Sequence, residues 1–423
     1  MSLRASSARW AKRLGLSLLI LLAGWIAFIC LYDEPLDPGF NEFYFSNQRS
    51  IPDDQNAVIG LLGLSAPAGA DFLKHGRAVA QNWQELVRGG GSIAFPGKLE
   101  STVRQLELDC WLYPADRFKD SHCASETRLA ALLKENAELL ARYRKVYRLP
   151  HFSGVPITDP LLLDLNKLIV AEIQLDLRKR RTKQAYEKWR DNHRFLVRAL
   201  AADATWIDKA IIRVSHALSL HVLDELLRTA PRIASEHHAE LLELLRPLEL
   251  SEHNLRGAVR AEYLLLDSLY GTPETLKFWV HPNFVRNRFY RFAQNYLEAC
   301  GNPNRLNERI EALRQKHILE WNLDYLSDPL NALLARMLLD GQVSAGVLVE
   351  GMYLKMAYTR LLALKVRILK ARIPDSQIAA FLQKVDANLR NPLTGEPMRW
   401  NSEKRVIYFD VSANKNEPHE VTL

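Results

Sequence analysis

Cysteine is scarce in this chain, which has four among its 423 residues. So small a number excludes a disulfide scaffold, in which many cross-links replace a hydrophobic core. The apolar share of 48% and the charged share of 25% are ordinary for a folded protein. The length suffices for one large or two medium domains, so we expect a conventional hydrophobic core.

Common catalytic and nucleotide-binding motifs are also missing. The sequence has neither the H-E-x-x-H zinc motif nor the G-x-S-x-G nucleophile elbow. Residues 91–99 fail as a phosphate loop, because five residues separate the two glycines instead of four and Leu99 follows the lysine. His221 and Glu225 are spaced for one helix face, but zinc usually takes at least three ligands from the protein. We therefore expect no metal and no other cofactor, and we assign no catalytic residue.

Charge of either sign is absent from residues 14–31, an apolar run about long enough to cross a bilayer core as one helix. Four cations lie in residues 1–13, and Asp33 and Glu34 follow the run. This distribution predicts a cytoplasmic N-terminus and a main domain outside the cytoplasm. A cleaved signal is one alternative, although the outer end lacks an A-x-A site. A lipoprotein signal is another, but the residue before its Cys30 is the bulky Ile29.

Helical spacing dominates the rest of the chain, where apolar residues recur three and four positions apart and prolines and glycines separate the segments. The expected class is all-α: a transmembrane helix, an irregular array of antiparallel helical hairpins and a small C-terminal β-hairpin. The predicted segments are a cytoplasmic basic tail (1–13), a transmembrane helix (14–32), a linker (33–53), a periplasmic helical domain (54–390) and a turn with a β-hairpin (391–423).

Two cysteines beyond the membrane, Cys110 and Cys123, bracket a short loop. In an oxidising compartment we expect them to form a disulfide. Closing such a loop would stabilise the fold by about 3 kcal/mol on the chain-entropy model. Two reduced and packed thiols are the alternative. Cys300 is left over at a predicted helix end, and we expect it to be a buried thiol.

A basic cluster follows one predicted helix and comprises Arg178, Lys179, Arg180, Arg181 and Lys183. Cations at a helix C-terminus complement the helix dipole, which is one interpretation of the cluster. The other is that these residues contact a partner or an anionic surface.

Two further patterns also allow a structural and a functional interpretation. Glu172 and Asp176 share a helix face, either as salt-bridge partners of neighbouring helices or as paired carboxylates of a glycosidase. Phe289, Phe292 and Tyr296 are spaced for one helix face. They form either core or, with nearby arginines, an aromatic and basic surface for glycan or lipid. We favour the structural interpretation in both cases.

Two short motifs carry a resemblance. The first is Asp53-Asp54-Gln55-Asn56-Ala57 leading into Leu61-Leu62-Gly63, and the second spans residues 391–400. The second is similar to a D-P-x-[ST]-G-x-P-[LM]-x-[YW] ending, with Asn391 where Asp is commoner. Together with the anchor, they resemble a group of uncharacterised membrane-anchored proteins of Gram-negative bacteria. The resemblance implies a location in the cell envelope and brings no catalytic residues.

These observations predict a single-pass protein of the bacterial inner membrane, with its main domain in the periplasm. We expect an interaction or scaffold protein without chemistry of its own, whose partners are the membrane and an unidentified envelope protein. A net charge of +7, four of which lie in residues 1–13, leaves the outer part only mildly basic and argues against nucleic acid. The alternative is a periplasmic hydrolase that acts on an envelope component through a carboxylate and histidine site.

The predicted orientation can be tested with reporter fusions. Alkaline phosphatase fused after Thr158 should be active, because that enzyme folds only in an oxidising compartment. A cytoplasmic reporter at the same position should be silent. The reverse pair of results would overturn the orientation and, with it, the case for a disulfide.

Overall fold

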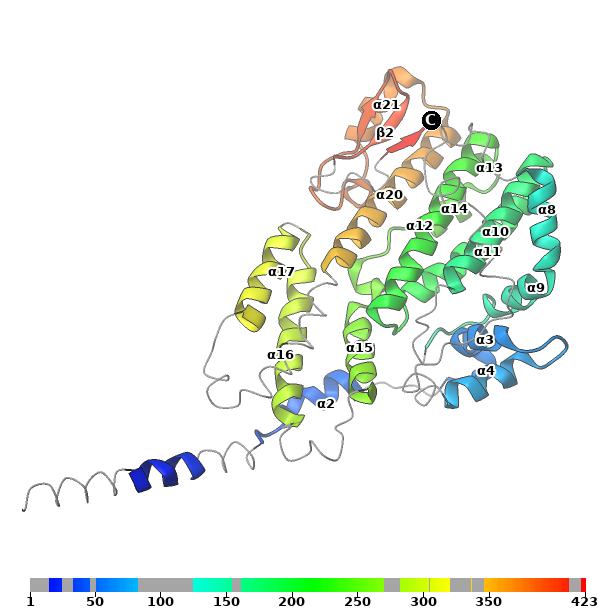
Figure 1. Cartoon of the computed structure of the whole chain (residues 1–423). Helices are drawn as coiled ribbons and strands as arrows, with labels where there is room; N and C mark the ends of the chain where they lie inside the picture. Colours follow the sequence, from blue (N-terminus) through cyan, green and yellow to red (C-terminus); the bar gives the residue numbers. More distant parts are fainter. Residues whose placement is uncertain are drawn as a thin grey trace, which may run out of the picture. The chain divides into compact units, whose positions relative to one another are not determined.

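The computed structural model describes residues 15–24, 33–45, 51–82, 125–153, 161–269, 282–303, 305–319, 336, 346–410 and 420–423. These residues are mostly helical, and a small antiparallel sheet lies near the C-terminus (Figure 1). The chain divides into two compact units. Unit 1 comprises residues 1–48, 266–300 and 307–345, and unit 2 comprises residues 49–265, 301–306 and 346–423.

The predicted transmembrane helix is described only over residues 15–24, which are helical and exposed. Among the helices that the structure describes, none is both long and apolar enough to cross a membrane. The remainder of the predicted segment 14–32 lies outside the described residues, as do Cys110 and Cys123 and the loop at residues 91–99.

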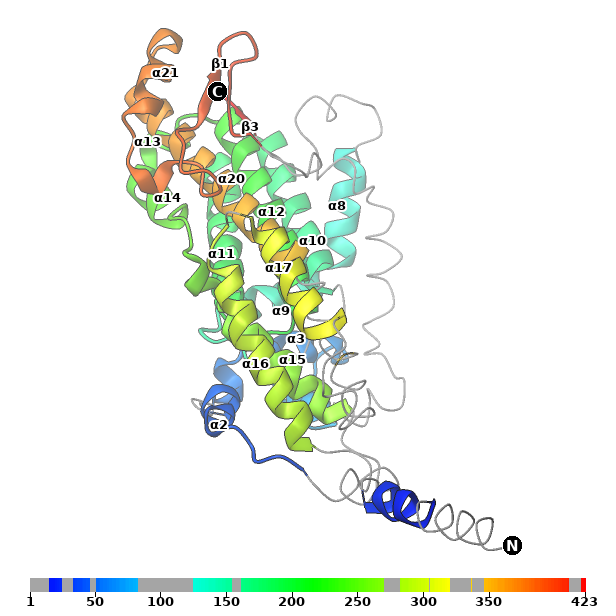
Figure 2. The same cartoon turned by 90° about the vertical axis from the view of Figure 1, so that its left-hand side faces the viewer.

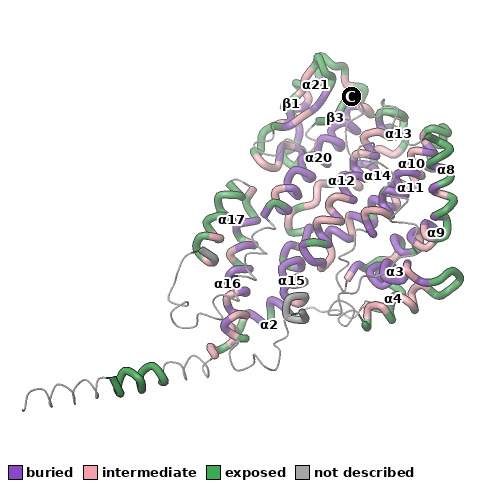
Figure 3. Tube along the Cα trace, in the orientation of Figure 1, coloured by how far each residue is buried: buried purple, intermediate pink, exposed green. Residues whose placement is uncertain are grey.

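Four long helices form the centre of unit 2 (Figures 1 and 2). They are α10 (Leu161–Arg178), α11 (Thr182–Leu200), α12 (Trp206–Thr229) and α20 (Gly346–Ala371). Figure 3 shows α20 buried along most of its length. The apolar spacing of the sequence predicts a helix from about residue 347 to residue 371, and α20 confirms this prediction almost to the residue.

The directions of the central helices follow from the residues that they join. Lys188 of α11 contacts Asp176 of α10 at 2.6 Å, while Asn192 contacts Asn166 at 2.5 Å, so α10 and α11 are antiparallel. The short turn from α11 to α12 reverses the chain again, so α12 runs parallel to α10.

Helix α20 also runs parallel to α12. The Tyr358 hydroxyl lies 3.2 Å from His221 Nδ1, and Lys365 Nζ lies 2.6 Å from an Asp224 carboxylate oxygen. Because the residue numbers rise together in both helices, the C-termini of α10, α12 and α20 all lie at one end of unit 2, the upper end in Figure 1.

Shorter helices surround this centre. They are α8 (Glu126–Glu135), α9 (Ala137–Val146), α13 (Ile233–Glu236), α14 (His238–Leu244), η3 (Leu250–His253), α15 (Leu255–Leu269), α21 (Asp375–Gln383) and η6 (Ala387–Leu389). Side chains cap several helices of unit 2, as their sequences predict. Ser125 accepts a hydrogen bond from the backbone of Arg128, and Thr205 forms a capping box with Asp208 at the start of α12.

The first motif of the resemblance, residues 53–63, forms η1 (Asp53–Gln55), α3 (Ala57–Leu62) and the start of η2 (Gly63–Ser65). The sequence predicts a single helix through Leu62 that Asp53 and Asp54 cap, but in the structure Asn56 caps α3. Its Oδ1 accepts from the backbone of Val58 at 3.1 Å, and its Nδ2 donates to the carbonyl of Ser153 at 2.7 Å. Asn56 thus ends one element, begins the next and fixes a distant loop.

Helix α4 (Phe72–Gln81) packs directly against α3 and η2 through glycines. A Cβ atom on Gly76 would lie 2.0 Å from the carbonyl oxygen of Ile59, and one on Gly63 would lie 1.9 Å from that of Phe72. The sequence predicts a helix from about residue 70 to residue 88, which the glycines at 89–91 end. The structure starts this helix after Asp71, whose carboxylate accepts from the backbone of Leu73 and Lys74. Its predicted extension to residue 88 lies partly outside the described residues.

The C-terminal segment forms a sheet with the order β1 (Arg399–Asn401), β2 (Val406–Tyr408) and β3 (Glu420–Thr422), all antiparallel. The predicted hairpin is β1 and β2, and the third strand was not expected. Ile407, Phe409 and Val421 are buried in the same core as α20. The tail is therefore an integral part of unit 2, which is what the apolar residues of the predicted hairpin indicated.

The turn that precedes the sheet explains the second motif of the resemblance. Asn391 Oδ1 accepts from the backbone of Leu393 at 3.0 Å, and the backbone of Asn391 exchanges hydrogen bonds with Glu396 and Gly395. Gly395 has a φ of +75°, a conformation that glycine adopts without strain. An aspartate at position 391 would offer the same acceptor, which explains why either residue suits this motif.

Unit 1 contains α2 (Pro38–Phe45), α16 (Pro282–Cys300), α17 (Leu306–Arg314, from its second residue onward) and a π-helix (Gln315–Leu319). The predicted linker thus includes a helix, and the expected domain 54–390 contributes α16 to another unit. Phe43 and Tyr290 pack edge to face, with their ring centroids 5.5 Å apart. Asn287 accepts from the backbone of Asp37 at 2.7 Å. Phe289, Phe292 and Tyr296 are buried, so the core interpretation of this stripe is confirmed.

The glycine contact between α3 and α4 predicts the effect of one methyl group. Gly76→Ala should lower the free energy of unfolding by about 1–3 kcal/mol, because overpacking outweighs the better helix propensity of alanine. The measurement is chemical denaturation of the full-length chain in detergent. Ala78→Gly, at an exposed position of the same helix, is the matched control and should cost no more than about 1 kcal/mol. A stabilising Gly76→Ala would contradict the close backbone contact.

Candidate functional site

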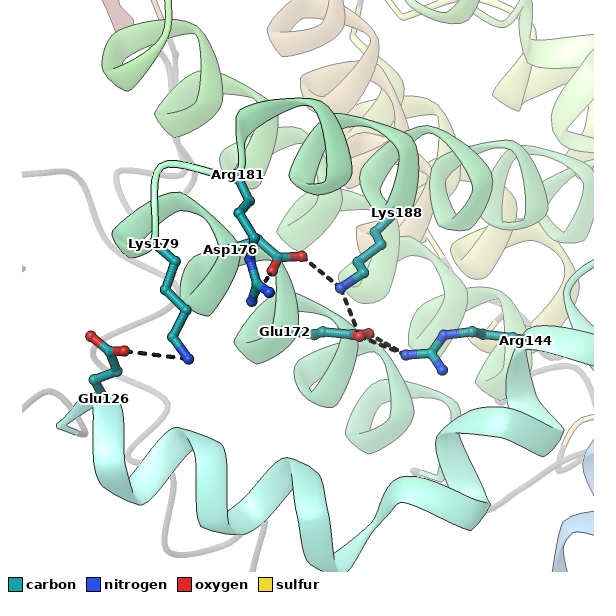
Figure 4. A network of polar contacts seen from close by, with 7 residues as sticks. All are labelled: Glu126, Arg144, Glu172, Asp176, Lys179, Arg181 and Lys188. Carbon is teal, nitrogen blue, oxygen red and sulfur yellow. Dashed lines mark hydrogen bonds and ion pairs between the residues drawn. The ribbon is translucent and has the colours of Figure 1, made fainter.

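An ion-pair network joins α9, α10 and α11 (Figure 4). Lys188 lies between the two carboxylates, 2.7 Å from Glu172 and 2.6 Å from Asp176. Arg144 contacts Glu172 at 2.6 Å, and Arg181 contacts Asp176 at 2.6 Å. The Asp176 residue is only 3% exposed, so its charge depends on these cations for compensation.

This network supports a structural role for the two carboxylates. Each accepts hydrogen bonds from cations that come from neighbouring helices, as the salt-bridge interpretation predicted. A glycosidase needs two carboxyl groups that face a substrate across a cleft. Glu172 and Asp176 are instead both bound to one ammonium group, so these two residues give the hydrolase alternative no support.

The predicted basic cluster forms the turn between α10 and α11, and all five of its residues are exposed. Arg180 has a φ of 57°, and the backbone of Arg181 donates to the carbonyl of Asp176 at 2.8 Å, which closes the helix end. Lys179 contacts Glu126 at 3.5 Å. Lys179 and Arg181 therefore have acidic partners within unit 2, and both interpretations of the cluster stay predictions.

Further cations gather at the same end of unit 2, after the C-termini of α12 and α20. Arg180, Lys183, Arg232, Lys370 and Arg372 are among the exposed cations there that have no ion pair among the described residues. Other cations there are neutralised, as Arg228 is by Glu225 at 2.6 Å and Arg405 by Asp375 at 2.9 Å. We call these five residues the basic end.

A cavity in unit 2 is a second candidate site, and it lies between α11, α12, α20 and η3. Its polar lining comes from His216 on α12, His253 at the end of η3, and Lys355 and Thr359 on α20. All four are less than 9% exposed. Arg246 lies at the cavity too and forms a bidentate pair with Glu252, with distances of 2.9 Å and 2.5 Å.

His253 is the unusual residue of this cavity. Both of its ring nitrogens are buried, and neither has a hydrogen-bond partner among the described residues. A buried polar atom without a partner typically costs 1–3 kcal/mol. The burial of the ring and, to a smaller extent, the nearby Lys209 lower the pKa of His253 to about 4. The imidazole is therefore neutral at pH 7, with one N–H donor and one acceptor.

Beside the cavity, His216 contacts a row of buried rings. The ring centroids of His216 and His193 lie 5.1 Å apart, and those of His193 and Trp189 lie 4.9 Å apart. Burial lowers the pKa of His193 to about 4 and that of His216 well below its ordinary value. These rings are consequently uncharged at neutral pH, and they pack as part of the core.

The buried Lys209 binds the backbone next to the cavity. The Lys209 ammonium donates to three carbonyl oxygens, those of Leu200, Ala202 and His253, the last at 2.8 Å. Two of these carbonyls belong to the C-terminal end of α11, which the ammonium therefore caps. Its burial lowers the pKa of Lys209 to about 7. This contact fixes the backbone of His253 and so the position of its ring.

His221 and Glu225, which were considered as metal ligands, contact different residues. His221 lies 3.2 Å from the Tyr358 hydroxyl, while Glu225 binds Arg228. In the parts of the chain that the structure covers, no three His, Cys, Asp or Glu side chains gather as metal ligands. Cys300 is buried at the end of α16, as expected, and burial raises the pKa of its thiol to about 12.

The histidine cavity was not predicted. The sequence around neither His216 nor His253 indicates a site. His216 and His253 come from different helices, and Lys355 and Thr359 come from a third helix, α20. Comparison of the chain with protein family models, with curated proteins and with solved structures finds no match. Any role for the candidate sites must therefore be argued from the geometry of this structure.

The buried histidines predict an acid-sensitive fold. His253 has an ordinary pKa of 6.5 when unfolded and about 4 when folded, so the unfolded chain binds a proton first. Stability is thus full above pH 6.5 and is lost as the pH falls toward 4, by about 3 kcal/mol for this residue.

Substitution isolates the contribution of His253. In His253→Leu, the free energy of unfolding should fall less steeply between pH 6.5 and pH 4 than in the unmodified protein. His238→Leu, which removes a partly exposed histidine of α14, is the control and should retain most of the slope. Equal slopes for the unmodified protein and His253→Leu would contradict the assignment.

Proposed function

We propose that this protein is an inner-membrane-anchored interaction protein that recruits an acidic envelope protein through the basic end of unit 2. It has no chemistry of its own in this proposal. The N-terminal apolar run would supply the anchor, and the charge distribution around that run supports a periplasmic location for unit 2. The resemblance to membrane-anchored envelope proteins supports the same location.

The observation that carries the proposal is the alignment of three helix C-termini with an excess of exposed cations. Helices α10, α12 and α20 end together, and each C-terminus carries a partial negative charge. Some of the cations near these C-termini offset this partial charge and so have a structural role. Arg180, Lys183, Arg232, Lys370 and Arg372 have no ion pair among the described residues, so their charge is available to another molecule.

An acidic partner suits this surface for electrostatic reasons. Complementary charge speeds association and excludes partners of the same sign more than it raises affinity. Association should therefore weaken as salt is added, because exposed charges are screened over about 8–10 Å at physiological ionic strength. Lys179 and Arg181, which already have partners within unit 2, should contribute less than the basic end.

Crosslinking in intact cells tests the proposal with a matched pair of variants. The triple variant Arg180→Glu, Lys183→Glu and Arg372→Glu should reduce the recovery of the crosslinked partner roughly tenfold, since it reverses the charge at two helix ends. The control Lys74→Glu, Lys134→Glu and Arg148→Glu makes the same change in net charge at exposed positions of other elements. Its recovery should match that of the unmodified protein.

Two outcomes would contradict the proposal. One is an equal loss in both triple variants, which would indicate a general effect of net charge. The other is full recovery of the partner with the first variant. Melting curves of both variants in detergent establish that any loss arises from the surface and not from unfolding.

A further inference from the structure

The residues that follow the apolar run belong to unit 1, where they contact α16. We propose that the start of α16 is a lipid-contacting surface, which Asp33 holds in the phospholipid headgroup layer beside the anchor. This contact rests on the anchor of the proposed function. It is independent of the basic end, which belongs to unit 2.

Asp33 caps α16 from a distant part of the sequence. Its two carboxylate oxygens accept hydrogen bonds from the backbone of Asn283 at 3.0 Å and of Phe284 at 3.1 Å. Backbone N–H groups in the first turn of a helix have no acceptor within that helix, so Asp33 satisfies two of them. Its negative charge also complements the dipole of α16.

The residues after Asp33 extend the same contact. Asn287 donates to Glu34 Oε1 at 2.7 Å and to the carbonyl of Pro35 at 2.9 Å. It also accepts from the backbone of Asp37 at 2.7 Å. Asn287 is only 1% exposed, so these bonds are shielded from water. This stretch is therefore fixed along the first turns of α16 instead of acting as a flexible tether, and we call these contacts the clamp.

Helix α2 continues along α16 in the direction that the clamp sets. The rings of Phe40 and Phe43 pack on Tyr290, and Tyr44 packs on Phe289. Because the residue numbers of both segments rise from the clamp to these ring contacts, the chain leaves the clamp alongside α16. The first turn of α16 is therefore its part nearest the anchor, and the later turns lie progressively farther from it.

The distance from Asp33 to the membrane follows from the length of the chain. A helix over the predicted segment 14–32 would be roughly 28 Å long, close to the thickness of the hydrocarbon layer of about 30 Å, so no spacer remains. Consecutive Cα atoms lie about 3.8 Å apart. Asp33 therefore falls in the headgroup layer, which is about 5–8 Å deep on each side of the bilayer. The first turn of α16, which Asp33 binds, falls there with it.

The composition of this stretch suits a phospholipid surface. Residues 282–291 contain no acid and three arginines, namely Arg286, Arg288 and Arg291. A guanidinium group binds phosphate through two parallel hydrogen bonds, and phosphate is common to phospholipid headgroups. The acids on the other side of the clamp accept hydrogen bonds within unit 1, as Asp37 does from the backbone of Gly39 at 2.9 Å.

Photocrosslinking measures this contact in the full-length protein, reconstituted into vesicles of phosphatidylethanolamine and phosphatidylglycerol. A benzophenone side chain in place of the exposed Pro282 should crosslink to phospholipid. The same side chain in place of Glu298, an exposed residue near the other end of α16, is the control. It lies about 24 Å along the helix and should give roughly fivefold less lipid adduct.

Substitutions of Asp33 show whether it positions α16. Asp33→Ala removes the cap and should lower the lipid adduct of the probe at position 282 roughly fivefold, the equilibrium factor for a cap of typical strength. Asp33→Asn retains an acceptor and should keep most of the adduct. Asp71→Ala is the matched control, because Asp71 caps α4 through the backbone of Leu73 and Lys74. It removes an equivalent cap from unit 2 and should leave the adduct unchanged.

Flotation of the vesicles separates this contact from the anchor. A protein that does not float with the vesicles lacks the anchor, which overturns the proposed function as well. A protein that floats but gives no lipid adduct from position 282 overturns the contact of α16 alone. Equal adducts from positions 282 and 298 would show that the clamp does not set which part of α16 meets lipid. An undiminished adduct with Asp33→Ala would show that Asp33 does not hold α16 there.

Discussion

The burial of α20 determines how unit 2 is assembled. This helix contacts α12, α13, α14 and the sheet, although it carries Lys355, Arg360 and Lys365. A buried charge is tolerated only with a partner, so each of these contacts fixes a neighbour. Lys365 donates to the Asp224 carboxylate at 2.6 Å, and Arg360 donates to the carbonyl of Arg390 at 2.6 Å. One helix thereby sets the register of α12 and the start of the C-terminal turn.

The parallel helices α10, α12 and α20 bring their C-termini, and the cations near them, to one end of unit 2. Three helices that run in one direction collect three partial negative charges at their ends, and nearby cations offset them. Arg181 and Lys179 bind acids of unit 2. In the proposal made above, the cations without an acidic partner form an interaction surface, which distinguishes them from ordinary helix caps. A basic turn alone could not have made this distinction, because it depends on where the other two helices end.

Local sequence patterns predicted what local chemistry determines. The bounds of α20, the burial of Phe289 and the ion pairs of Glu172 all follow from helical spacing. Contacts between distant segments were not predictable in this way. The sequence of residues 38–45 does not indicate that they pack against α16. The sequence of β3 does not indicate that it pairs with β2. The histidine cavity was missed for the same reason, since residues 216 and 253 meet only when α12 and η3 pack together.

Unit 1 joins residues that are 250 positions apart, as the contact between Asp37 and Asn287 shows. At ordinary rates of synthesis, roughly 10–50 s separate the appearance of α2 from that of α16. Throughout that interval, α16 is not yet available to Phe40, Phe43 and Tyr44, whose rings contact it in the folded chain. Most of unit 2 is made in the meantime, so the nascent chain carries an exposed aromatic segment next to a domain that is already folding. Its yield therefore depends on whatever shields that segment until α16 arrives.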